Sequence, residues 1–179
     1  ADGDRLVVDA CCIKGHQDTL FLGPLPPHEA KPGGFIGPKQ YAPRRVGRQY
    51  FRRCRIEGDV DFIFGGARAY FEGCEIRSLN RDMDVNGYVT AASTPKGEPY
   101  GFVFHGCSFT APDGVAPDSV YLGRPWREWA QTVLIDCWLG RHIKREGWWD
   151  WNKPAAHNCV QYAGAILHGP AGDTTGWVP

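Results

Sequence analysis

Apolar and polar residues alternate in several short segments of the chain, which is the period of a β-strand and not of a helix. These segments are rich in Val, Ile, Phe, Tyr and Thr, the residue types that pack well on a pleated surface. The clearest are Arg5–Ile13, Tyr88–Ala92, Tyr100–Phe109 and Thr132–Leu139. The 23 glycines and 14 prolines leave few uninterrupted stretches for helices. The pattern therefore predicts an all-β protein.

One stretch of this pattern occurs twice. Residues 11–21 (CCIKGHQDTLF) align without gaps on residues 54–64 (CRIEGDVDFIF), with the Cys, Ile, Gly, Asp and final Phe positions in common. The core of the unit is an apolar residue, two variable residues, Cys, a variable residue and an apolar residue, and it returns three more times. Its cysteines, at intervals of 43, 20, 33 and 30 residues, are Cys11, Cys54, Cys74, Cys107 and Cys137.

Repeats of this size predict a solenoid, in which each turn buries its apolar face against the next. The uneven intervals fit short parallel strands joined by loops of variable length better than they fit a helical repeat. Because parallel crossovers are right-handed, we expect a right-handed parallel β-helix. We expect one domain over residues 1–179, with a loop rich in Pro and Gly inserted over residues 23–47 and a C-terminal tail over residues 163–179. A long loop on a rigid scaffold commonly lines a binding groove.

The totals give no reason to expect a nucleic-acid or membrane partner. The formal net charge is zero, and no apolar run approaches the ~20 residues that a membrane span requires. We interpret the repeat cysteines as small buried residues stacked in a ladder. A disulfide between neighbouring turns stays open, whereas no cysteine spacing matches a zinc site.

Six arginines gather in one region despite the neutral total: Arg44, Arg45, Arg48, Arg52, Arg53 and Arg55. We interpret them as a solvated loop and the outer face of one strand. The alternative is a surface that attracts an anionic polymer. Asp82 and Asp84 are interpreted as a polar turn, because their spacing does not match that of a calcium loop.

The duplicated stretch places Asp18 and Asp61 at equivalent positions on neighbouring turns. Paired carboxylates serve ester hydrolysis, glycoside hydrolysis and acid proteolysis, which need the two groups in different protonation states at one pH. Close placement of like charges achieves this by raising one pKa. Because apolar residues flank Asp61 and would limit its solvation, we predict a catalytic pair rather than two surface residues.

Three segments, in this order, resemble the signature segments of pectin methylesterases: residues 17–20 (QDTL), 58–65 (GDVDFIFG) and 122–126 (LGRPW). The second and third together are highly specific. The resemblance extends to about Tyr162, and the variants look closer to bacterial than to plant members. It implies a parallel β-helix that removes methyl esters from pectin (homogalacturonan), with no metal or organic cofactor. It also implies a secreted or cell-envelope protein, which we expect to be a monomer without nucleic-acid or membrane partners.

The resemblance implies a role for each matching residue. Asp61 would be the nucleophile that attacks the ester carbonyl, and Asp18 the acid that protonates methanol and then activates water. Gln17 would donate to the developing oxyanion. Arg124 would face the substrate and hold the Asp61 carboxylate in its ionised form. Trp126 would stack on a galacturonate ring.

Other residues of the same types receive no catalytic role. We interpret Trp148, Trp149 and Trp151 as packing and rim residues. The mechanism needs no imidazole, so we expect His16 and His105 to take no part in it.

The chain departs from the family before its first strand. Family members carry a Gly-x-Tyr-x-Glu segment and a Gln-Ala-x-Ala-Leu segment, and neither occurs in the 179 residues. We therefore expect the first turns of the solenoid and a second oxyanion glutamine to be absent, and loss of one oxyanion donor typically costs about 3 kcal/mol of transition-state stabilisation. In addition, Gly66 stands where the family commonly has Asn.

Two alternatives to an active esterase stay open. One is a catalytically impaired or inactive fragment that only binds pectin, because of the absent oxyanion segment. The other is a different pectin-degrading enzyme on a β-helix, which paired aspartates alone allow and the LGRPW segment disfavours.

Overall fold

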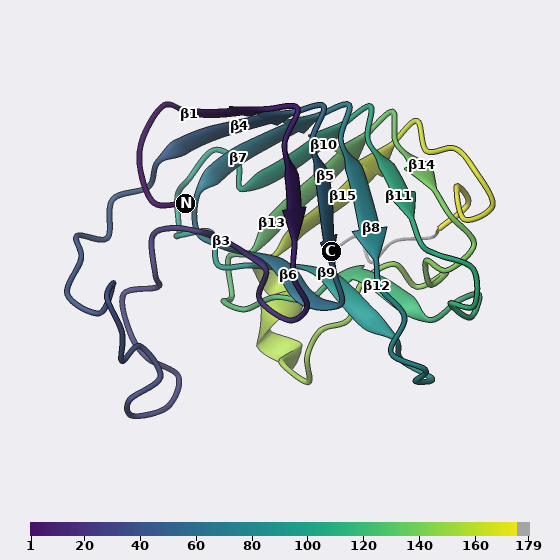
Figure 1. Cartoon of the computed structure of the whole chain (residues 1–179). Coiled ribbons are helices and arrows are strands. Elements are labelled where there is room, and N and C mark those ends of the chain that lie inside the picture. The colour runs from purple at the N-terminus through teal and green to yellow at the C-terminus, as the bar shows by residue number, and fades with distance from the viewer. Residues whose placement is uncertain (175–179) are drawn as a thin grey trace.

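A computed structural model describes residues 1–174, and the chain winds through them as a solenoid of short strands (Figure 1). Strands of neighbouring turns pair in parallel, so that each turn adds strands to sheets that run along the solenoid. The pairing of residues 60–65 with residues 87–92 shifts register between Val60 and Ile63, where Asp61 lies. The prediction of an all-β parallel β-helix is therefore confirmed.

The strands of the described residues form three sheets. The six-stranded sheet contains, in order, β1 (Leu6–Asp9), β4 (Arg48–Arg52), β7 (Arg68–Glu72), β10 (Phe102–His105), β13 (Gln131–Ile135) and β15 (Gln161–Ala165). The five-stranded sheet contains β2 (Cys12–Lys14), β5 (Arg55–Gly58), β8 (Glu75–Ser78), β11 (Ser108–Thr110) and β14 (Trp138–Leu139). The four-stranded sheet contains β3 (Leu20–Leu22), β6 (Val60–Gly65), β9 (Gly87–Ala92) and β12 (Val120–Gly123).

A short 3₁₀ helix, η1 (Pro154–Asn158), precedes β15. Across residues 1–174, no helix has the length and apolar character needed to cross a membrane.

Each turn bends sharply at the residue before the repeat cysteine. Five residues there have a positive φ of 52° to 59°: Ala10, Arg53, Gly73, Gly106 and Asp136. This left-handed conformation ends a strand of the six-stranded sheet and redirects the chain into the five-stranded sheet. The β-rich segments 5–13, 100–109 and 132–139 therefore each contain two strands divided at this corner. The alternation of apolar and polar residues continues through the corner and hides it in the sequence.

The repeat cysteines line one edge of the core. Cys54, Cys74, Cys107 and Cys137 are buried, and each thiol lies 3.4 to 3.5 Å from a backbone carbonyl of the preceding turn, to which it donates. The predicted ladder is confirmed for these four, and the cysteines of the described residues are free thiols. Cys11 is exposed, contrary to that interpretation, because it lies on the first turn and no strand of residues 1–174 covers its outer side.

Phenylalanines stack along the solenoid beside the cysteines. Phe51, Phe71 and Phe104 occupy the same register position of β4, β7 and β10. Their rings stack with centroid separations of 5.0 and 4.5 Å. Such pairs are worth ~0.5–1.5 kcal/mol each beyond the area they bury, so the stack fixes the turns relative to one another.

Two irregular segments were expected from the sequence. Residues 23–47 join β3 to β4 through turns and project from the body of the solenoid (Figure 1). At the other end, β15 extends to Ala165, past the expected start of the tail at residue 163, because residues 163–165 pair with residues 133–135 of β13. Residues 175–179 of the expected tail lie outside the described residues.

Candidate active site

Asp18 and Asp61 lie at the same corner of neighbouring turns, where the chain enters the four-stranded sheet. Both have a left-handed backbone conformation, with φ of 55° and 50°. The strands that follow them pair in register, Leu20 with Ile63, and the Asp18 N–H donates to the Val60 carbonyl oxygen at 3.0 Å. Left-handed conformations cost a residue other than Gly free energy, although Asp tolerates them better than most, and they cluster at functional sites. The two carboxylates suggested by the duplicated stretch are thus brought together.

Asp61 forms a two-bond ion pair with Arg124, a residue 63 positions later in the chain. The guanidinium Nε donates to Oδ1 at 2.8 Å and Nη2 donates to Oδ2 at 2.7 Å. The exposed fractions of the side chains are only 8% for Asp61 and 12% for Arg124. A bidentate pair in this setting is strong and fixes the plane of the carboxylate.

Backbone bonds to the neighbouring turn place Arg124 at the end of β12. Its N–H donates to the Thr90 carbonyl oxygen of β9 at 3.0 Å. Gly123, the preceding residue, passes so close to β9 that a Cβ there would lie 2.0 Å from the Thr90 hydroxyl oxygen. Only Gly permits this approach, which explains the glycine of the LGRPW segment.

Aromatic rings enclose the guanidinium of Arg124. Its Cζ lies 3.9 Å from the ring centroid of Tyr88 and 3.8 Å from that of Trp151, and Trp149 is 5.4 Å away. Trp149 also stacks on Tyr88 with a centroid separation of 5.4 Å. Stacking of a guanidinium on rings is attractive, more so when water is excluded. Trp149 and Trp151 thus pack against the guanidinium, together with Tyr88, to which the sequence assigned no role.

The surroundings of both carboxyl groups favour their protonated forms. Burial raises the pKa of Asp61 above its ordinary value, and the charges of Arg124 and Lys153 oppose this increase. The pKa of Asp18 is also raised, first because neighbouring protein atoms partly desolvate its carboxyl group and second because of the negative charge of Asp61. Asp18 is nevertheless exposed as a residue, so it lies at the open side of the site and Asp61 at the closed side.

A sequence model of the family described as Pectinesterase matches residues 41–179. The chain belongs to the pectinesterase family. It is 32% identical over 176 residues to the pectinesterase/pectinesterase inhibitor PPE8B of Prunus persica, covering 95% of this chain and 30% of the peach protein.

Solved structures of pectin methylesterases share the fold. The enzyme of Aspergillus niger superimposes with a TM-score of 0.71 at 30% identity, over 95% of this chain and 50% of the fungal one. A pectin methylesterase in complex with a hexasaccharide gives a TM-score of 0.71 at 27% identity, over 94% of this chain and 50% of the other. The chain thus spans about a third of the curated relatives and half of the solved ones. The expected likeness to bacterial members in particular stays a prediction.

The other two predicted site residues of this pectinesterase chain lie beside the carboxylate pair. Trp126 is half-buried, and its ring meets those of Phe64 and Phe35 edge-on at 5.8 and 6.3 Å. Phe35 belongs to the inserted loop, which therefore reaches the site. Gln17 is exposed next to Asp18. Their roles as sugar platform and oxyanion donor stay predictions.

A cavity of about 510 Å³ adjoins this site on the side of Trp126. Its walls include the basic residues Lys96, Arg127 and Lys153, the acidic residues Glu29 and Glu128, the ring of Trp129, and His28 of the inserted loop. Arg127 Nη2 donates to the His28 carbonyl oxygen at 3.0 Å, which attaches the loop to the cavity wall. Within residues 1–174, no group of three or more His, Cys, Asp or Glu side chains is placed to hold a metal ion.

The two histidines that were expected to take no part make structural contacts. His16 Nδ1 lies 2.9 Å from Asp59 Oδ2, a contact between neighbouring turns just before Asp18 and Asp61. His105 Nδ1 lies 3.0 Å from the Tyr70 hydroxyl on the six-stranded sheet.

The arginine-rich region makes ion pairs and backbone contacts. Arg48 donates to both oxygens of Asp4, and Arg52 and Arg53 share Asp9. Arg44 donates to backbone carbonyls inside the loop. These contacts fit the interpretation as a solvated surface better than that of a polymer-binding one.

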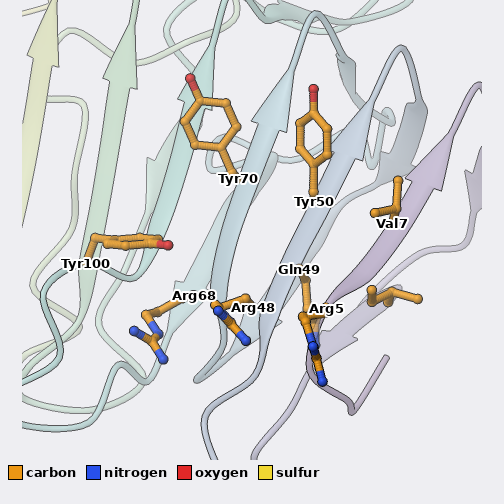
Figure 2. A pocket seen from close by; sticks show the side chains of 9 residues that line it. Arg5, Val7, Arg48, Gln49, Tyr50, Arg68, Tyr70 and Tyr100 are labelled. Carbon is orange, nitrogen blue, oxygen red and sulfur yellow. The ribbon is translucent and has the colours of Figure 1, made fainter.

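Part of this region borders a second groove, on the outer face of the six-stranded sheet. Figure 2 shows Arg48 and Arg68 side by side below Tyr50 and Tyr70. The groove measures about 550 Å³, and Arg68 lies 3.4 Å from Glu98. It does not include the Asp18–Asp61 pair, so the candidate active site lies at the four-stranded sheet.

Proposed function

We propose that the chain hydrolyses methyl esters of pectin, leaving galacturonate carboxylates and releasing methanol. The observation that carries the proposal is the buried, bidentate Arg124–Asp61 pair with Asp18 at the equivalent corner of the next turn. It supplies one buried carboxyl group whose ionised form is stabilised by Arg124 and a second, more exposed carboxyl group whose pKa is raised. Membership of the pectinesterase family supports the same reaction.

In the first step, a carboxylate oxygen of Asp61 attacks the carbonyl carbon of the methyl ester. Gln17 donates to the oxyanion that forms. The carbon–methoxy bond then breaks while protonated Asp18 transfers its proton to the departing oxygen, so methanol leaves. The product is an anhydride between Asp61 and the galacturonyl group, with Asp18 ionised.

In the second step, ionised Asp18 takes a proton from water, whose oxygen attacks the galacturonyl carbon of the anhydride. The bond to Asp61 breaks and its carboxylate is released, together with the acid form of the sugar. Asp18 is protonated again, so the two steps regenerate the starting state. Because Asp18 exchanges protons in both steps, its position on the open side of the site suits the role.

Arg124 favours the reactive state of Asp61 without occupying all of its lone pairs. Each oxygen of a carboxylate has two acceptor sites, and the guanidinium uses one on each oxygen. The positive charge opposes the effect of burial on the Asp61 pKa. The guanidinium therefore limits the rise in the Asp61 pKa that desolvation of the site causes.

The surroundings of the pair support an acidic polysaccharide as substrate. The adjoining cavity carries three basic residues, two acidic residues and an aromatic ring, and a structurally similar pectin methylesterase binds a hexasaccharide. Trp126, next to Arg124, would stack on a sugar ring. With this polymer as substrate, we expect the protein to act outside the cell or in the cell envelope, as a monomer.

Methanol release from highly esterified pectin tests the proposal, with Asp61→Asn as the inactive control. Release by the wild-type chain and none by the variant supports the aspartyl mechanism. Release that Asp61→Asn leaves unchanged contradicts it. Binding of pectin without methanol release by a folded wild-type chain favours the binding-only alternative, and new reducing ends or unsaturated products favour a chain-cleaving enzyme.

A further inference from the structure

Lys153 joins the last part of the chain to the turn that carries Trp126. It lies immediately before η1, and its ammonium Nζ is 2.7 Å from the Pro125 carbonyl oxygen and 3.3 Å from the Trp126 carbonyl oxygen. Both distances allow the ammonium group to donate. The side chain thus fastens the two backbone carbonyls that follow Arg124.

The same ammonium group belongs to the aromatic enclosure of Arg124. Lys153 Nζ lies 4.1 Å from the ring centroid of Trp151, which also contacts the Arg124 guanidinium at 3.8 Å. Lys153 is half-buried and lines the cavity beside Trp126. The Lys153 side chain therefore contacts the Trp126 turn and the aromatic rings around Arg124, and it lines the cavity.

The charges that face Lys153 are known from each element packed against it. Arg127 and Arg124 bring positive charge, and Asp61 brings the opposing negative charge. Lys96, Glu29 and Glu128 line the same cavity as Lys153. With Asp61 paired by Arg124, the three basic residues of the cavity, Lys96, Arg127 and Lys153, face two acidic ones, Glu29 and Glu128, so one positive charge remains in excess. Such an excess attracts an acidic polymer and not a neutral one.

We propose that Lys153 is a positioning residue that holds the Trp126 turn in place and makes the binding of an acidic polysaccharide depend on its own charge. The inference rests on the proposed function for the identity of the polymer, a polyuronate. It adds a residue that the signature segments do not contain.

The ammonium group of Lys153 loses its proton in a pH range in which binding can be measured. Burial, followed by the charges of Arg127 and Arg124, lowers the pKa of Lys153 to about 8. Below that pH the group is an ammonium ion with three donors, and above it a neutral amine. Affinity for a polyuronate should therefore fall as the pH rises through about 8.

Trigalacturonic acid is the probe, because it carries uronate groups and no methyl ester, so it binds without turnover. Its dissociation constant is measured by calorimetry from about pH 6.5 to about pH 9.5, where its carboxylates stay ionised. The chains compared are wild type, Lys153→Met, Lys153→Arg and, as a matched control, Lys144→Met. Lys144 also donates to a backbone carbonyl, that of Asp118 at 3.0 Å, and faces a ring, that of Tyr121 at 5.2 Å.

The wild-type affinity should fall about tenfold across this range, as expected for loss of one charge-assisted contact. Lys153→Met should bind about tenfold more weakly at neutral pH and show little dependence on pH. Lys153→Arg should keep its affinity at the alkaline end, because its side chain stays charged. Lys144→Met should match the wild type throughout.

Two results overturn the inference. One is that Lys153→Met binds trigalacturonate with the affinity and pH dependence of the wild type. The other is that Lys153→Arg loses affinity at the same pH as the wild type. A wild-type chain that binds no trigalacturonate at any pH overturns it as well. Circular dichroism identifies a variant that fails to fold, and Lys153→Arg still decides the matter if Lys153→Met does not fold. Methanol release by the wild type is measured separately, so failure of the proposed function is distinguished from failure of the role of Lys153.

Discussion

Asp18 and Asp61 occupy one corner of two successive turns, both with a left-handed backbone, and the strands after them pair in register. Their backbones are therefore separated by about the spacing of paired strands, ~4.8 Å. At such a separation two carboxylates repel each other, so one of them readily keeps a proton. The stacking of the solenoid thus contributes to the raised pKa of Asp18, second to the desolvation of its carboxyl group.

Replacing either carboxyl group with its amide should remove activity and leave the fold intact. Asp61→Asn loses the nucleophile and Asp18→Asn loses the proton donor, so methanol release should fall by a factor on the order of 10⁴ in each case. The double variant should be little worse than either single one, because the two groups act as a unit. Unchanged circular dichroism shows that the loss is chemical. A single variant with wild-type activity would refute the assignment for that residue.

Loss of Arg124 should affect both stability and the pH profile. In Arg124→Leu the buried Asp61 carboxylate loses its partner, so the variant should be about 3–5 kcal/mol less stable at neutral pH. Without the guanidinium the pKa of Asp61 rises further above its ordinary value, so the acidic limb of activity should move to higher pH. Arg124→Lys keeps the positive charge but cannot form both hydrogen bonds of the guanidinium. Its stability and the pH of its acidic limb should lie between those of the wild type and Arg124→Leu. Urea unfolding measures the loss of stability, and methanol-release rates across the pH range measure the shift of the acidic limb. An acidic limb in Arg124→Leu at the same pH as in the wild type would contradict the role of Arg124.

Asp18 should make the folded chain less stable once it is ionised. Its pKa is raised in the folded state above the ordinary 3.8, so the folded state holds this proton more tightly than the unfolded state. Stability contributed by the protonated form is present at low pH and is lost as the pH rises from the unfolded pKa through the folded one. Asp18→Asn should therefore raise the melting temperature at pH ~7 and leave it unchanged at pH ~3.

The control for this effect is Asp84→Asn, a change to an exposed carboxylate in the turn before β9. Melting curves of the three chains at the two pH values decide the matter. An Asp18→Asn chain that melts below the wild type at neutral pH would show that the carboxylate stabilises the fold instead.

The corners before the repeat cysteines make a prediction that does not depend on function. Gly106 has a φ of 59°, and a Cβ there would meet no atom within 4 Å. Gly106→Ala should therefore destabilise the chain by about 1 kcal/mol through backbone strain alone. Gly3→Ala, where the added methyl group also meets open space, is the matched control and should leave urea unfolding nearly unchanged. Equal midpoints for the two variants would contradict the strain at this corner.

The sequence predicted those features that repeat from turn to turn. The stacking could be predicted from the repeat cysteines, because each turn has the same small buried position next to that of the following turn. These cysteines are Cys54, Cys74, Cys107 and Cys137. Asp18 and Asp61 could be matched to each other for the same reason. The corners before the repeat cysteines could not be predicted, because the alternation of apolar and polar residues continues through the left-handed residue at each corner.

What the sequence did not predict comes from contacts between distant segments. Arg124 could be assigned to Asp61 only through the family resemblance, since nothing in the residues between them specifies the contact. Tyr88, Trp151 and Lys153 surround Arg124 from β9 and from the segment before η1. They share no spacing or repeat, so no periodic pattern could identify them as one group.

The site draws one residue from each of four successive turns: Asp18, Asp61, Tyr88 and Arg124. Their positions follow from the stacking of strands, and the number of residues between them has no influence. Evolution can therefore lengthen or shorten most connections between turns without disturbing the chemistry. Two segments are exceptions: segment 23–47, since Phe35 lies against Trp126, and the segment before η1, which carries Trp151 and Lys153. A change in the length of segment 23–47 would therefore move Phe35 relative to Trp126 and alter the surroundings of that ring.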